Sequence, residues 1–133
     1  MAVVAAAMLG MSAAGNVAVA GSATTTATNT ATTTVTITAS GCGLHPWCHK
    51  PATPTVQRST KVVWKNMTLV PHDVMPCTEA ACKVSPGAGT DKVASPTINP
   101  NKTYTFTFLH PGTYVYDCLW HGYAVMHGTI IVH

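Results

Sequence analysis

The chain has 133 residues, of which 47% are hydrophobic and only 8% are charged. A chain of this length has room for one domain, which excludes a large multidomain assembly. The net charge of +3 comes from seven basic and four acidic residues. The basic residues form no run and do not alternate with aromatic residues, so nucleic-acid binding has no support. A weakly basic surface would still attract an acidic partner protein.

The N-terminal part of the chain is unlike the rest, because no charged residue precedes Lys50. Residues 1–20 are mostly Ala, Val, Met and Gly, and Ala18-Val19-Ala20 fits a small-residue signal cleavage site. A basic n-region is missing, so a transmembrane anchor is the alternative. Polar residues interrupt the stretch and no basic flank follows it, which favours a signal peptide. We therefore expect an exported protein, secreted, periplasmic or at the cell surface, with no membrane span after cleavage.

The elements expected after this segment are a linker and an all-β domain. Residues 21–34 are nearly all Thr, Ala and Ser, which is typical of a low-complexity linker. The folded domain is expected over residues 35–133. Strands are expected, in chain order, at residues 35–40, 55–57, 61–65, 72–75, 102–109, 113–118 and 129–132. Gly- and Pro-rich loops are expected at residues 41–48 and 76–100, the latter with at most one edge strand. Seven or eight short strands predict a Greek-key β-sandwich.

Five cysteines are informative because their number is odd. Cys42, Cys48, Cys77 and Cys82 can form two disulfides in an exported protein, and Cys118 then remains the one free thiol. Pairing of Cys42 with Cys48 and of Cys77 with Cys82 is favoured, since each pair brackets a short turn-like stretch. Cross-pairing stays open. A zinc site at Cys42, His45, Cys48 and His49 is the weaker alternative to the first disulfide.

The most specific motif lies near the C-terminus. Cys118, His121 and Met126 follow the pattern C-x2-H-x4-M, directly after one expected strand and before the last one. His72, at the start of another expected strand, can reach the same end of a sandwich. One thiolate, two imidazoles and a thioether form the ligand set of a blue, type 1 copper site. Met67 and Met75 are the other methionines considered for the axial position, but neither lies in the ligand loop.

Two stretches of the chain resemble the cupredoxins, and within them the plastocyanin-like small blue copper proteins. The first is Val63-Trp-Lys-Asn66 with Pro71-His-Asp-Val74, and the second is residues 114–128 with Thr129-Ile-Ile-Val132. The resemblance covers residues 35–133. It implies an eight-stranded sandwich that holds one copper ion. It also implies that the residue after the first histidine ties the two ligand segments together. Here that residue is Asp73, where plastocyanins commonly carry Asn, and an ionised carboxylate cannot donate a hydrogen bond.

The function predicted from these features is an exported single-electron carrier that is not an enzyme and acts as a monomer between redox partner proteins. His121 is the expected exit for the electron, with Trp120 or Tyr123 either at an apolar docking patch or packed in the loop. A copper carrier or storage module is the main alternative. A copper oxidase or nitrite reductase would need a second copper centre, and the chain has neither a His-x-His pair nor the length for a second domain.

Overall fold

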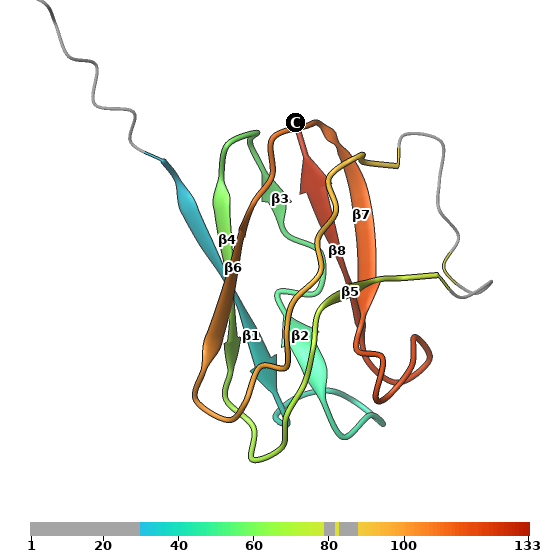
Figure 1. The fold of residues 1–133 in the computed structure, drawn as a ribbon. Coiled ribbons are helices and arrows are strands. Elements are labelled where there is room, and N and C mark those ends of the chain that lie inside the picture. Colours follow the sequence, from blue (N-terminus) through green and yellow to red (C-terminus); the bar gives the residue numbers. More distant parts are fainter. Residues whose placement is uncertain (1–29, 79–81, 83–87) are drawn as a thin grey trace, which may run out of the picture.

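The fold is a sandwich of two four-stranded β-sheets. It is seen in a computed structural model that describes residues 30–78, 82 and 88–133. The predicted signal peptide and most of the predicted linker lie outside the described residues. Figure 1 shows the two sheets facing each other, with a long connection between β5 and β6. No helix among the described residues has the length and apolar character needed to cross a membrane. The all-β prediction is confirmed.

The first sheet has the order β2-β1-β4-β6 and the second has the order β3-β8-β7-β5. The strands of the first sheet are β1 (Thr32–Thr38), β2 (Cys48–Lys50), β4 (Lys61–Asn66) and β6 (Thr103–Thr107). The strands of the second sheet are β3 (Thr55–Val56), β5 (Met75–Pro76), β7 (Gly112–Asp117) and β8 (His127–Val132). The pairs β1–β4 and β3–β8 are parallel, whereas the other pairs are antiparallel.

The observed strands differ from the predicted ones in three main places. β1 begins at Thr32, within the predicted linker, because Thr32–Thr34 pair with the start of β4. β2 was not predicted, since its three residues are too few to show a period, and it forms by pairing with the end of β1. The expected strand at residues 72–75 is instead a single bridge at His72, followed by β5, which pairs with β7.

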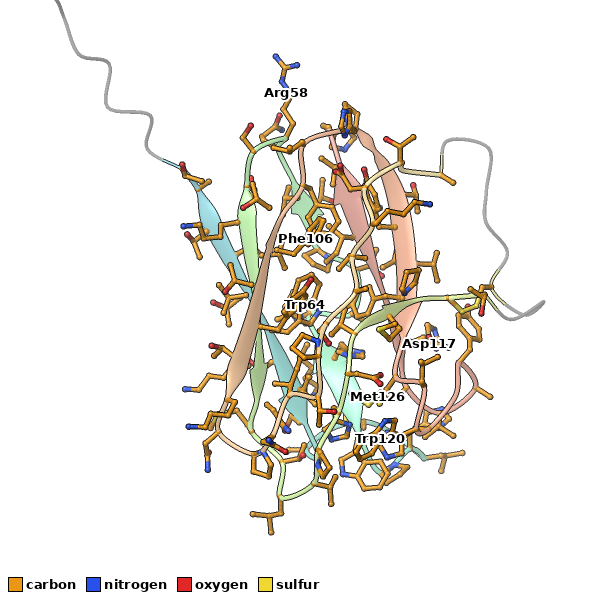
Figure 2. The ribbon with its side chains drawn as sticks, in the orientation of Figure 1. Arg58, Trp64, Phe106, Asp117, Trp120 and Met126 are labelled. Atoms are coloured by element: carbon orange, nitrogen blue, oxygen red, sulfur yellow. A yellow bond between two sulfur atoms is a disulfide. The ribbon has the colours of Figure 1, made fainter. Side chains whose placement is uncertain are left out.

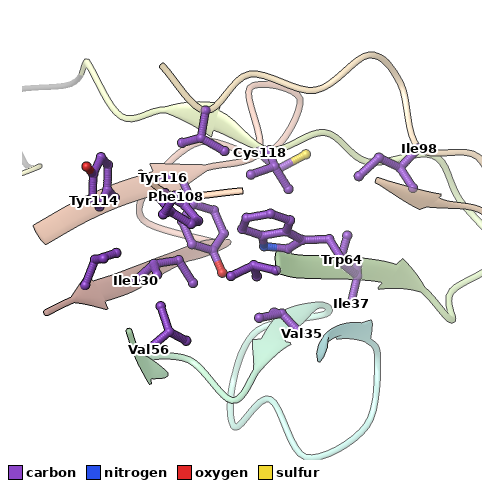
Figure 3. Close-up of a cluster of buried hydrophobic side chains, with 14 of the residues drawn as sticks. Val35, Ile37, Val56, Trp64, Ile98, Phe108, Tyr114, Tyr116, Cys118 and Ile130 are labelled. Carbon is purple, nitrogen blue, oxygen red and sulfur yellow. The ribbon is translucent and has the colours of Figure 1, made fainter. Parts of the chain in front are cut away.

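Alternating side chains from both sheets build one core between them. Val35, Ile37, Val62 and Trp64 point inward from the first sheet and are fully buried. Figure 3 labels Val35, Ile37 and Trp64 beside Tyr116 and Ile130 of the facing sheet. The thiol of Cys118, the residue after β7, lies in the same cluster. The period-2 pattern read in the sequence therefore corresponds to the observed faces. The core extends to the end of the sandwich where β1, β4 and β7 finish, so the thiol of Cys118 lies at its edge.

The three connections at this end hold the candidate site. They are the β1–β2 loop (residues 39–47), the segment after β4 (residues 67–74) and the β7–β8 loop (residues 118–126). Figure 1 shows all three at the end opposite the C-terminus, and Figure 2 labels Met126 and Trp120 there. Segments that are far apart in the sequence are thus brought to one place by the sandwich.

Both favoured disulfides are present. Cys42 pairs with Cys48 across 5.4 Å between Cα atoms, and Cys77 pairs with Cys82 across 6.0 Å. Cys118 is the one free cysteine and is buried. The first disulfide removes both sulfur ligands of the alternative zinc site. His49 points into the core and its ring faces Tyr116, whereas His45 is exposed, so that site is not assembled.

Candidate metal centre

Three of the four predicted ligands converge at the end of the sandwich. The Sγ atom of Cys118 lies 3.2 Å from Nδ1 of His121 and 3.8 Å from Nδ1 of His72. One ligand atom from each of these three residues lies within 4.8 Å of the others. His72 and Cys118 are completely buried, and His121 is half-buried. The predicted grouping of these three residues is therefore present in the fold.

Met126, the fourth predicted ligand, is buried in the core cluster that also contains Cys118. The ligand loop is closed by backbone hydrogen bonds, because the Cys118 amide donates to the Met126 carbonyl at 3.1 Å. Within the loop, the amides of His121 and Gly122 donate to the Cys118 carbonyl. Gly122 has a φ of 74°, a left-handed conformation that favours glycine. The C-x2-H-x4-M spacing thus corresponds to a compact, internally hydrogen-bonded loop.

Met67 and Met75, the alternative candidates for the axial ligand, are less well placed than Met126. Met67 is 51% exposed, and Met75 lies in β5 and is paired with Asp117 of β7. His127, which directly follows Met126, is exposed, with its ring stacked on Tyr123 at 4.1 Å between centroids. Trp120 is 57% exposed, so of the two aromatic residues beside His121 it is the one that faces solvent.

His72 is held in position through both its backbone and its ring. Its amide and carbonyl exchange hydrogen bonds with Ile98, at 3.2 and 2.7 Å. Its Nε2 atom lies 2.9 Å from the hydroxyl oxygen of Thr68, whose own proton has two acceptors within reach, Oδ1 of Asn66 at 2.8 Å and the Val70 carbonyl at 2.9 Å. With its proton directed to either of them, the hydroxyl oxygen can accept a hydrogen bond from Nε2–H, which leaves Nδ1 unprotonated toward Cys118. This is the tautomer that a metal bound at Nδ1 requires.

Asn66, the last residue of β4, organises this segment. Its side-chain amide donates to the carbonyls of Val70 and Ile98, both at 2.8 Å. Its Oδ1 atom accepts from the amide and the hydroxyl of Thr68. All four contacts are made by a side chain with no exposed surface. The sequence analysis placed Asn66 in a matching stretch but assigned it no role, because its partners lie on segments that only the fold brings together.

Asp73 connects the two ligand segments by accepting a hydrogen bond through its carboxylate. Its Oδ1 atom accepts a hydrogen bond from the amide of Leu119, the residue after Cys118, at 2.8 Å. An ionised carboxylate is a stronger acceptor than an amide oxygen. The substitution of Asp for Asn therefore keeps the accepting half of the contact and adds a negative charge close to the thiol.

Burial sets the proton affinities of the three converging groups. It lowers the pKa of His72 to about 4, with the neighbouring His121 acting in the same direction and Asp73 opposing it. It also lowers the pKa of His121, again against the effect of Asp73. The pKa of the Cys118 thiol is raised by burial, although hydrogen bonds with the backbone of Asp73 and Trp120 act to lower it. Neutral imidazoles are ready to bind a metal, and a soft cation would replace the thiol proton.

The donor set fits copper. Sulfur and imidazole donors in a buried site suit a soft ion, and a thiolate with two imidazoles matches a blue copper centre. The polar contacts of His72 and the closed loop around Cys118 hold these donors in place without the ion. Residues that hold ligands in this way typically affect metal affinity 10- to 100-fold when they are replaced.

A different buried histidine makes the stability depend on pH. His49 is 1% exposed, and among the described residues neither ring nitrogen has a well-formed hydrogen bond. Burial lowers its pKa to about 4, although the backbone of His127 opposes this effect. The unfolded chain therefore binds more protons than the folded one between about pH 6.5 and 4. Stability is complete above this range and falls as the pH decreases through it.

We expect the His49→Phe variant of the metal-free protein to lose this part of the pH dependence. Phe has nearly the same shape but no proton to bind, so the fall in unfolding free energy from pH 7 to 4.5 should be about 2–3 kcal/mol smaller than in the wild type. Urea unfolding at both pH values measures it. His45→Phe, at an exposed position, is the control and should follow the wild type. Equal pH dependence in all three proteins would contradict the role of His49.

Comparison with known proteins agrees with the fold and the donor set. The family model of copper-binding proteins of the plastocyanin/azurin family matches residues 35–133. Amicyanin-alpha of Methylorubrum extorquens is 34% identical over 77 residues, which are 58% of this chain and 57% of that protein. The chain thus spans little more than half the length of this relative.

Solved structures show the same sandwich at low sequence identity. A purple cupredoxin from Nitrosopumilus maritimus superposes with a TM-score of 0.57 at 23% identity, over 75% of this chain and 98% of that one. A copper-containing nitrite reductase from Thermus scotoductus gives a TM-score of 0.59 at 22% identity, but the match covers 75% of this chain and only 22% of the reductase. Together with the family match, these findings mean that the chain belongs to the plastocyanin/azurin family of copper-binding proteins.

Proposed function

We propose that the protein is an exported single-electron carrier with one type 1 copper ion held by His72, Cys118, His121 and Met126. The observation that carries the proposal is the convergence of the buried Cys118 thiol with two imidazole Nδ1 atoms. Copper bound there would supply one-electron chemistry by alternating between Cu(I) and Cu(II). The chain's contribution is rigidity, since the ligands sit on a hydrogen-bonded loop and a bridged segment that need not rearrange.

The surface around His121 supports docking of a redox partner. Leu44, Met67, Leu69, Leu119 and Trp120 are all more than half exposed, and they come from the three loops at this end. These loops contain no Lys, Arg or Glu, and their one acidic residue, Asp73, is buried. Exposed apolar side chains gathered in one place mark an interaction site. Because the loops lack exposed charge, the partner is held mainly by apolar contact, and association should depend little on salt.

A copper titration tests the proposal. Addition of Cu(II) to the purified metal-free protein should give an intense blue colour at one equivalent, and voltammetry should show reversible one-electron cycling. A colourless site that binds only Cu(I) and releases it readily would favour the alternative of a copper carrier or storage module. The protein is proposed not to be an enzyme, because a copper enzyme needs a second copper centre. The second group of possible ligands among the described residues contains Cys77 and Cys82, which are joined in a disulfide.

The axial ligand can be tested separately. We expect Met126→Gln to keep the colour and lower the reduction potential, because an amide oxygen is a harder donor than a thioether and stabilises Cu(II). Voltammetry and the visible spectrum measure both effects. Met67→Gln is the matched control, since Met67 is exposed and should leave the potential unchanged. An unaltered potential in Met126→Gln, or a lowered one in the control, would show that Met126 is not the axial ligand.

A further inference from the structure

Trp47 covers the copper site from a loop outside the ligand segments. Its indole lies 4.3 Å from the imidazole of His121 between ring centroids, at an interplanar angle of 37°. It also meets the ring of His72 edge-on at 5.6 Å. The other neighbours of the His121 ring are Cys118, at 3.2 Å from Nδ1, and His72, at 4.9 Å between centroids. The half-buried His121 ring is thus packed against Trp47, a residue from outside the ligand segments.

The β1–β2 loop fixes the position of Trp47. The disulfide between Cys42 and Cys48 closes the loop at its base, and Cys48 already pairs with Thr38 in the sheet. Trp47 directly precedes Cys48, so its backbone is anchored beside a strand. The amide of His45 donates to the carbonyl of Cys42 and forms a turn within the loop. The tip of the loop, by contrast, points to solvent, since Leu44 is fully exposed.

We propose that Trp47 is a positioning residue for His121. The disulfide-closed loop holds the indole against the imidazole, which keeps the ring in its ligating orientation and slows loss of the metal. The argument depends on the proposed role of His121 as a copper ligand. Among the described residues, the backbone of His121 is hydrogen-bonded within the short ligand loop, to Cys118. His72, by contrast, is held by Thr68 at its ring and by a bridge to Ile98 at its backbone. His121 is therefore the histidine whose orientation depends more on a contact from another segment, and Trp47 makes that contact.

The size of the effect follows from aromatic pairing. Packed aromatic rings stabilise one another by an amount that corresponds to about three- to tenfold in a rate or an equilibrium constant. We expect Trp47→Ala to release Cu(I) to a competing chelator about three- to tenfold faster than the wild type. Trp47→Phe keeps a flat ring in the same place and should remain within about twofold. His45→Ala removes an exposed side chain from the same loop and should have no effect.

Two further measurements separate positioning from a general loss of structure. In the metal-free protein, NMR relaxation of the His121 ring should show greater mobility in Trp47→Ala and near-normal order in Trp47→Phe, while the ring of Tyr116, buried in the core, stays as ordered as in the wild type. The double variant Cys42→Ser/Cys48→Ser frees the loop and should shift both readouts in the same direction as Trp47→Ala. Wild-type Cu(I) release and an equally ordered His121 ring in Trp47→Ala would overturn the proposal. If the wild type does not bind copper, the proposed function fails, and the NMR comparison still decides whether Trp47 positions His121.

Discussion

The Cys118→Ser variant is expected to lose the visible absorption of the copper-loaded protein completely while the sandwich remains folded. The colour of a type 1 site comes from charge transfer between the thiolate and Cu(II), and Cys118 is the one cysteine outside the two disulfides. Serine occupies less space and its hydroxyl stays protonated, so it cannot replace the thiolate. The absorption spectrum after addition of one equivalent of Cu(II) measures this outcome.

The fold of the variant is expected to survive because Cys118 contributes little to the core beyond its own volume. Its backbone amide still donates to the Met126 carbonyl, and the carbonyl still accepts from His121 and Gly122. Far-ultraviolet circular dichroism and urea unfolding check this directly. His45→Ala, which removes an exposed histidine at the same end, should keep the full colour. Persistence of the blue band in Cys118→Ser would mean that the ligand assignment is wrong.

Features that depend on local sequence could be predicted. The alternation in residues 35–38 gives the buried face of β1, and the C-x2-H-x4-M spacing predicts a short ligand loop. The odd number of cysteines identified Cys118 as the free thiol, because the other four form two disulfides between cysteines that are close in the sequence. The alternation and the spacing are each contained within a few consecutive residues, and the cysteines need only be counted, so no knowledge of the fold is needed to read these signals.

Most features that depend on contacts between distant segments could not be predicted from the sequence. The bond from Asn66 to Ile98 joins residues 32 apart, and the contact of Asp73 with Leu119, which joins residues 46 apart, was expected only from the family resemblance. Trp47 lies in a stretch read as irregular, although an aromatic residue next to a disulfide cysteine is a signal that could have drawn attention to it. β2 is set by its pairing with β1 rather than by any period of its own. The convergence of His72, Cys118 and His121 was thus predictable, whereas most of the residues that orient them required the fold.

Replacement of Asn66 by Ala is expected to lower both stability and copper affinity. The substitution removes two donated and two accepted hydrogen bonds of a fully buried side chain. It leaves the Thr68 amide without its partner, so the loss of unfolding free energy should be about 3–4 kcal/mol. Thr68 also loses the nearer of the two acceptors for its hydroxyl and keeps the Val70 carbonyl, so Cu(I) affinity should fall by about 10-fold, the lower end of the usual range for such residues. Urea unfolding of the metal-free protein and competition with a Cu(I) chelator measure the two effects.

Two matched variants separate these effects of Asn66. Thr68→Val removes the hydroxyl beside His72 but leaves the bonds from Asn66 to Val70 and Ile98, so it should lose copper affinity with a smaller loss of stability. Asn99→Ala changes an exposed asparagine and should alter stability by less than about 0.5 kcal/mol. If Asn66→Ala loses stability but keeps full copper affinity, the Asn66–Thr68–His72 chain does not orient the ligand. If it loses neither, the buried network is not what holds this end of the sandwich together.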